Sequence, residues 1–88
     1  MRPLFVQIKC ELGQADAVSD ALFDEFDELG ELYSTSGPFD LLVKFNLDED
    51  TDISGFITRR LHKIKGIRDT STLIAFRMHV NPRLNKVG

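Results

Sequence analysis

Apolar and polar residues alternate over residues 4–12, which is the pattern of a β-strand with one buried face. Gly13 ends this strand, and an amphipathic helix is predicted to follow. Acidic residues fill the outer face of the helix, and Gly30 is a suitable residue to close it, because glycine tolerates a left-handed backbone. The apolar stripe of this helix consists of Ala15, Val18, Leu22, Phe26 and Leu29.

The middle of the chain predicts a β-hairpin. A short strand over residues 32–36 is followed by a turn at Gly37 and Pro38, and a third strand is predicted over residues 39–47. One face of the third strand is apolar and consists of Leu41, Val43, Phe45 and Leu47. A polar stretch then separates this hairpin from the next element.

A second helix and a fourth strand complete the pattern. Thr51 or Asp52 can cap the helix, and Gly66 ends it. The fourth strand is predicted over residues 68–78. The buried stripe of the helix is predicted to consist of Ile53, Phe56, Ile57, Leu61 and Ile64.

The order of elements, β-α-β-β-α-β, predicts an α+β fold. Each of its two β-α-β crossovers should be right-handed, and the usual arrangement that satisfies both is the ferredoxin-like sandwich. In that sandwich two helices cover one face of a four-stranded antiparallel sheet. We expect one domain over residues 1–80, followed by an extended C-terminal tail at residues 81–88, where Pro82 interrupts any regular pattern.

The strand patterns also indicate a dimer. Phe5, Leu42 and Leu73 point away from the strand face that carries Val6 and Val43, so both faces of the sheet are partly apolar. The two helices can cover only one face. We therefore expect a homodimer with facing sheets, a dimeric α/β barrel, although scattered exposed apolar residues are an alternative explanation.

Composition narrows the possible functions. The chain has 88 residues and a net charge of −3, which does not favour a general nucleic-acid or membrane binder. Cys10 is the single cysteine, and the first residues lack a signal-peptide pattern, so we expect a cytoplasmic protein. Thirteen of the 14 acidic residues precede Ile53, whereas eight of the 11 basic residues follow it. This asymmetry indicates either two solvated helix faces or surfaces that pair between subunits.

Motifs for enzymatic catalysis or cofactor binding are absent from the sequence. Cys10 shares a strand face with core residues, His62 occupies a solvent-facing helix position, and His79 ends the fourth strand. Neither histidine has a second ligand at metal spacing, so we expect no catalytic residue, metal or cofactor. A basic set in the second helix indicates a solvated face rather than a nucleic-acid site, because no aromatic residues are interleaved with it. This set consists of Arg59, Arg60, Lys63 and Lys65.

The hairpin corner, STSGPFD at residues 34–40, is the best candidate for a binding site. Free backbone N–H groups near Gly37 suit a ligand carboxylate, and the side chain of Asp40 suits an ammonium group. Hydroxyls of Thr70 and Thr72 lie together on one face of the fourth strand. The same residues are also ordinary in turns and strands, so the residues alone leave both interpretations open.

Three segments of the chain resemble the effector-binding domain, or RAM domain, of the Lrp/AsnC transcription regulators. They are FVQIKCELGQADAV, LYSTSGPFDLLVKF with the G-x-[YF]-D corner, and GFITRRLHKIKGIRDTSTLIAF with the GI-x-x-T-x-T element. The resemblance implies dimers that pair through their sheets and often assemble into rings of eight. It also implies a small effector, usually an amino acid, bound between dimers near the corner. Carried over by position, the ligand-binding candidates are Ser36, Gly37, Phe39, Asp40, Thr70 and Thr72.

The chain departs from this family in two respects. Pro38 removes one backbone N–H donor from the corner. Family regulators also carry an N-terminal helix-turn-helix domain, whereas this chain begins at its first strand, so it resembles either a stand-alone sensing domain or a fragment of a longer protein. The resemblance therefore implies a sensing and oligomerisation domain that does not itself bind DNA and that can assemble with full-length relatives. The alternatives are a small dimeric α/β-barrel enzyme, either an isomerase or a cofactor-free oxygenase, and a purely structural assembly module.

Overall fold

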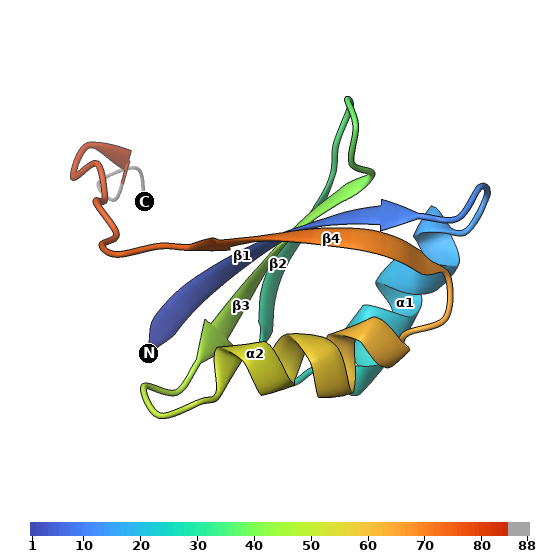
Figure 1. Cartoon of the computed structure of the whole chain (residues 1–88). Helices are drawn as coiled ribbons and strands as arrows, with labels where there is room; N and C mark the ends of the chain where they lie inside the picture. The colour runs from blue at the N-terminus through green and yellow to red at the C-terminus, as the bar shows by residue number, and fades with distance from the viewer. Residues whose placement is uncertain (85–88) are drawn as a thin grey trace.

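A computed structural model describes residues 1–84 and confirms the ferredoxin-like α+β fold. The strands are β1 (Arg2–Cys10), β2 (Leu29–Ser34), β3 (Leu41–Leu47) and β4 (Ile67–Ile74). They form one antiparallel sheet in the order β2-β3-β1-β4. The helix α1 (Ala15–Glu25) and a helical segment that begins with α2 (Ile53–Gly55) lie on the same side of this sheet (Figure 1).

The core lies between the sheet and the two helical segments. Along β1 and β3 every second side chain is buried, as the alternating pattern predicts. Three phenylalanines at the centre, Phe26, Phe45 and Phe56, pack edge to face with ring centroids 5.1–5.4 Å apart. This aromatic cluster joins the residue that follows α1 to β3 and to the second helical segment.

Helix α1 ends earlier than predicted. It stops at Glu25, and the following Phe26 is extended although its side chain stays buried. Gly30 is therefore not the residue that closes the helix, because it lies in β2, where the pairing of β2 with β3 changes register. A Cβ atom at Gly30 would lie 2.6 Å from the Nδ2 atom of Asn46, so glycine here permits close approach of the two strands.

The second helix is irregular. Helix α2 continues into a π-helical turn, η1 (Phe56–Arg60), and a 3-10 turn, η2 (Leu61–Lys63). The wide turn places Phe56 and Leu61, five residues apart, on the same buried face. The buried stripe is confirmed, since Ile53, Ile57 and Ile64 pack against the core. Asp52 occupies the N-cap position, but its carboxylate pairs with Arg59 at 2.9 Å and makes no capping bond.

Arg60 ties the second helix to the segment that follows α1. Its guanidinium donates to both carboxylate oxygens of Glu28, at 2.6 and 3.3 Å. It also lies over the rings of Phe26 and Phe56, 4.7 and 5.2 Å from their centroids. The hydrogen bond from Arg60 lowers the pKa of Glu28. Arg60 is thus not a member of a freely solvated basic face.

Seven of the eight strand boundaries differ from the predictions, by one to four residues, and the end of β3 at Leu47 is the exception. Strand β2 begins at Leu29 instead of residue 32, β3 begins at Leu41 instead of residue 39, and β4 ends at Ile74 instead of residue 78. The last pair between β1 and β4 joins Leu4 to Ile74, and beyond it β1 continues to Arg2 paired with β3 alone. The predicted tail at residues 81–88 is described as far as Leu84, and its last four residues lie outside the described part of the chain.

The sheet face opposite the helices, which we call the open face, is partly apolar. Register places Phe5 beside Leu73 and Lys44, and Leu42 beside Gln7 and Tyr33, all on this face. Leu73 and Tyr33 keep 55% and 53% of their surface exposed, so residues 1–84 of one chain do not cover them. The predicted second apolar face is therefore present.

Gly66 and Gly13 form a matched pair for testing how β4 is anchored. Both have a left-handed backbone, with φ of +97° at Gly66 and +75° at Gly13. A Cβ atom added at Gly66 would lie 2.8 Å from Cγ2 of Val18, whereas a Cβ atom added at Gly13 would have no atom beyond its chain neighbours within 4 Å. We expect Gly13→Ala to lower the free energy of unfolding by about 1–2 kcal/mol. Gly66→Ala should lower the free energy of unfolding by roughly 1–3 kcal/mol more than Gly13→Ala, because the added methyl group also crowds Val18 of α1. Urea unfolding measures both; equal losses would contradict the packing argument.

The pair formed by Arg60 and Glu28 predicts an acid-sensitive contribution to stability. Because the pKa of Glu28 is lowered in the folded state, its contribution is complete above the unfolded value of about 4.3. It is lost as pH falls through the folded pKa, and for a partly exposed pair it amounts to about 1 kcal/mol or less. Urea midpoints measured from pH 7 to pH 3 should fall more steeply for wild type than for Glu28→Gln. Parallel pH profiles would contradict this assignment.

Candidate functional site

The corner between β2 and β3 projects beyond the sheet as a closed turn (Figure 1). Thr35 closes it with two bonds: its Oγ1 donates to the carbonyl of Phe39 at 3.0 Å, and its backbone N–H donates to the carbonyl of Asp40 at 2.9 Å. Gly37 has φ of +100°, a backbone conformation that residues other than glycine rarely adopt. The turn residues STSGPFD therefore perform the structural role that their chemistry predicts.

Asp40 joins the corner to β1. Its backbone N–H donates to the carbonyl of Ile8 at 2.8 Å, and its Oδ2 atom accepts the N–H of Cys10 at 2.7 Å. The carboxylate thus replaces a main-chain carbonyl where the pairing of β1 with β3 stops at Leu41. Within residues 1–84 the other oxygen, Oδ1, accepts no hydrogen bond.

Cys10 belongs to the core, as predicted, with 7% of its surface exposed. Burial raises the pKa of its thiol, and the nearby charge of Asp40 raises it further. A thiol with a raised pKa is a poor nucleophile, because the thiolate is the reactive form. The geometry therefore gives Cys10 a packing role next to the corner.

The corner also presents unused donors. Among the described residues, the backbone N–H groups of Ser36, Gly37 and Phe39 donate to no acceptor, and Pro38 has no N–H. Lys9 reaches the corner from β1, and its Nζ donates to the carbonyl of Pro38 at 3.2 Å. Lys9 was not predicted from the sequence, because its proximity depends on the pairing of β1 with β3. The corner thus combines free N–H groups, a lysine and a half-engaged carboxylate.

The two threonines lie elsewhere in the same chain. Thr70 pairs with Ile8 and Thr72 with Val6, so both side chains point to the helix side of the sheet. Strand β1 separates β4 from β3, which puts β4 about 10 Å from the β3 side of the corner. One chain therefore brings Ser36, Gly37, Phe39 and Asp40 together and leaves Thr70 and Thr72 apart from them.

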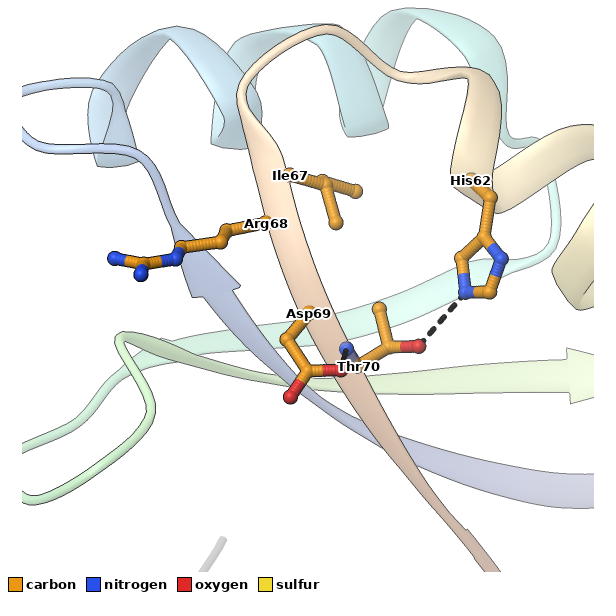
Figure 2. Close-up of a pocket in the computed structure, with 5 residues that line it drawn as sticks. All are labelled: His62, Ile67, Arg68, Asp69 and Thr70. Carbon is orange, nitrogen blue, oxygen red and sulfur yellow. Dashed lines mark hydrogen bonds between the residues drawn. The ribbon is translucent and has the colours of Figure 1, made fainter.

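Thr70 forms a hydrogen bond with His62 that was not predicted from the sequence. Nε2 of His62 lies 2.8 Å from Oγ1 of Thr70, and Figure 2 shows the ring reaching β4 from the end of the second helix. The two residues line a pocket of about 210 Å³ together with Ile67, Arg68 and Asp69. His62 is exposed, as predicted, but the turn at Gly66 folds β4 back against it. Only the folded turn reveals this contact.

Comparison with protein families identifies a family whose model spans both the corner and strand β4. The family model described as the Lrp/AsnC ligand binding domain matches residues 4–84. The chain belongs to this family. The match takes in the corner, Thr70 and Thr72, and it confirms the resemblance inferred from the sequence motifs.

Two sets of relatives support this assignment. The chain is 28% identical over 75 residues to the HTH-type transcriptional regulator FL11 of Pyrococcus furiosus, covering 85% of this chain and 48% of that protein. It therefore spans about half the length of this curated Lrp/AsnC relative. Among solved structures, FFRP-DM1 has a TM-score of 0.78 and 33% identity, covering 86% of this chain and 100% of the other. TTHA0845 from Thermus thermophilus has a TM-score of 0.80 and 27% identity, covering 92% and 100%.

A further solved structure shows the same fold at low identity. The regulator NMB0573 from Neisseria meningitidis was solved as a complex with L-Met, and it has a TM-score of 0.76 and 15% identity to this chain. The match covers 91% of this chain and 53% of that protein. Within the described residues of this Lrp/AsnC domain, no helix is long and apolar enough to cross a membrane.

The bond from Cys10 to Asp40 predicts different effects for two substitutions. Asp40→Ala leaves a part-buried N–H without its acceptor and should lower the free energy of unfolding by about 1–3 kcal/mol. Asp40→Asn keeps an acceptor oxygen at that position, so its free energy of unfolding should fall by less than half the loss in Asp40→Ala. Urea unfolding at pH 7 measures both variants. Equal losses for the two would show that the bond does not hold the corner to β1.

Proposed function

We propose that this Lrp/AsnC domain binds a small zwitterion, an amino acid, at the corner. The observation that carries this proposal is the state of the corner, where a carboxylate has one free oxygen and several N–H groups donate to no acceptor in residues 1–84. An amino acid has matching groups, an ammonium and a carboxylate. Charge-assisted hydrogen bonds of this kind are about twice as strong as neutral ones.

In this proposal each end of the ligand meets a different part of the corner. The ammonium group donates to Oδ1 of Asp40, whose orientation is fixed because Oδ2 already holds the N–H of Cys10. The ligand carboxylate accepts from the backbone N–H groups of Ser36 and Gly37, which form an anion-binding concavity. Phe39 is half-buried beside Asp40 and offers an apolar contact for the side chain of the ligand.

An assembly completes the site. Thr70 and Thr72 are two strands away from the corner of their own chain, so we propose that they contribute hydrogen bonds to the corner of a neighbouring subunit. Dimers form through the open face, and dimers associate into a higher oligomer such as an octameric ring. The complex of the Neisseria meningitidis regulator with L-Met supports an amino acid as ligand, since the two folds agree.

The biological role we propose is transcription regulation through assembly. The FL11 relatives are HTH-type regulators, and this chain matches about half of their length. Co-assembly with such regulators would place ligand-dependent subunits beside their DNA-binding domains. In this scheme the domain acts in the cytoplasm, responds to the amino-acid concentration and catalyses no reaction.

Calorimetric titration with each of the twenty amino acids tests the proposed ligand. We expect at least one to bind wild type, and Asp40→Asn to weaken that binding by roughly 10–100-fold, because a charged partner is lost while the turn is kept. The matched ligand control is the same molecule without its ammonium group. It should bind wild type and Asp40→Asn with similar, weak affinity.

Two results would overturn the proposal. One is the absence of binding for all twenty amino acids, which would leave the domain as an assembly module. The other is equal affinity of wild type and Asp40→Asn for the bound amino acid, which would place its ammonium group away from the corner. Circular dichroism of the variant excludes unfolding as the cause of lost binding.

A further inference from the structure

The chain beyond β4 exposes a run of apolar side chains. We call residues 75–84 the C-terminal arm, and it extends away from the sheet (Figure 1). Phe76 is 99% exposed, and Met78 and Val80 are 67% and 50% exposed. A fully exposed phenylalanine loses the stabilisation that burial of its large apolar surface provides. Contact with a second molecule would recover this stabilisation.

Two adjoining hollows lie where the arm leaves the open face. Their volumes are about 130 and 290 Å³, and they share Pro3, Lys44, Arg77 and Met78 in their linings. Phe5 and Ala75 complete the smaller one, and Met1, Asn46 and Phe76 complete the larger one. The lining side chains are apolar apart from Asn46 in the larger hollow and the two cationic side chains, and Met1 in the larger hollow carries the N-terminal ammonium group, which pairs with Glu49.

Neither cation is neutralised inside the described residues. No acidic group lies within 4.0 Å of the charged nitrogens of Lys44 or Arg77 in residues 1–84. Glu31 is the cross-strand neighbour of Lys44 on the open face, but its Oε1 accepts the hydroxyl of Tyr33 at 2.8 Å. An apolar hollow bordered by unpaired cations suits an aromatic ring, because the ring buries apolar surface and its face attracts cations.

We propose that Phe76 of a second copy of this chain occupies these hollows. In a two-fold dimer each subunit offers the same surface, so each Phe76 enters the hollows of the other subunit while receiving its partner's ring beside Lys44 and Arg77. The inference rests on the proposed dimer through the open face and adds its central contact. The arm supplies both the ring that enters and one wall of the hollow that receives it.

This contact also reduces the electrostatic cost of covering the open face. A second sheet placed on this face desolvates Lys44, and burial of an unpaired charge is strongly unfavourable. Aromatic faces over Lys44 and Arg77 compensate part of that cost without an acidic partner. A small anion with an apolar body is the competing occupant, and the experiment below separates the two.

A single tryptophan reports on this contact, because the chain contains none. In Phe76→Trp the indole should show blue-shifted emission and protection from iodide at high protein concentration, and both should disappear on dilution. The matched control is Phe23→Trp on α1, where the native ring is 59% exposed and lies outside the hollows. Its emission should stay that of an exposed indole at all concentrations.

Truncation of the ring gives the energetic test. By sedimentation equilibrium, Phe76→Ala should raise the dimer dissociation constant by at least about 10-fold, as is typical for a buried aromatic anchor. Phe76→Leu should lie between wild type and Phe76→Ala, because it keeps apolar area but loses the ring face. Phe23→Ala should leave the dissociation constant unchanged. Urea unfolding at a protein concentration where both proteins are monomeric should give the same stability for Phe76→Ala and wild type, which would exclude misfolding of the variant.

The outcomes separate this inference from the proposed dimer. A monomeric wild type would overturn both. A wild-type dimer would overturn only the exchange of Phe76 if the indole of Phe76→Trp stayed exposed and Phe76→Ala dimerised with the same dissociation constant. Binding of a short-chain carboxylate that is lost in Lys44→Met but kept in Phe76→Ala would assign the hollows to a small anion, and would also overturn the exchange.

Discussion

Coverage of the sheet is the constraint on which the rest of this structure depends. Four strands present two faces, and α1 and the second helical segment both lie on one of them. The buried face takes the alternating residues of β1 and β3, which form a continuous core with the three central phenylalanines. The open face then keeps Phe5, Leu42 and Leu73 without helices over them. The proposed dimer would supply a cover for that second face.

The sequence predicted the elements better than their ends. Strict alternation gave β1 and β3, and the apolar stripe gave α1, because burial on one face enforces those periods. Gly30 was misassigned since a glycine that closes a helix and a glycine that permits close strand approach look the same in a sequence. The buried stripe predicted Phe56 and Leu61 on one face, but the π-helical turn that brings them there was not predicted, because apolar spacing does not specify the hydrogen-bond pattern of a helix. Strand β4 ends at Ile74, opposite Leu4, because residues after it leave the sheet, and the apolar pattern of residues 68–78 does not record that departure.

In the candidate site, too, local features were predictable from the sequence and long-range contacts were not. The corner was predictable, since Gly37 and Pro38 mark a turn and its neighbours come with it. The contacts of the candidate residues were not predictable. Cys10 and Lys9 reach the corner through the pairing of β1 with β3, and His62 reaches Thr70 through the turn at Gly66. These contacts join residues 8 to 30 positions apart, and no local pattern records them. Thr70 and Thr72 were predicted from their shared strand face and from family resemblance, and within one chain they stay apart from the corner.

Strand β4 connects the two proposed surfaces. It is an edge strand, held along one side by β1, at its start by the turn at Gly66, and near that turn by the bond from Thr70 to His62. Its far end passes directly into the arm that carries Phe76. Docking of Phe76 on a second copy would therefore fix the end of the strand that the sheet leaves without a partner. A strand fixed at both ends holds Thr70 and Thr72 in place for the corner of a neighbouring subunit. Dimer contact and ligand contact then share one rigid element, which is the physical requirement for assembly to respond to a ligand.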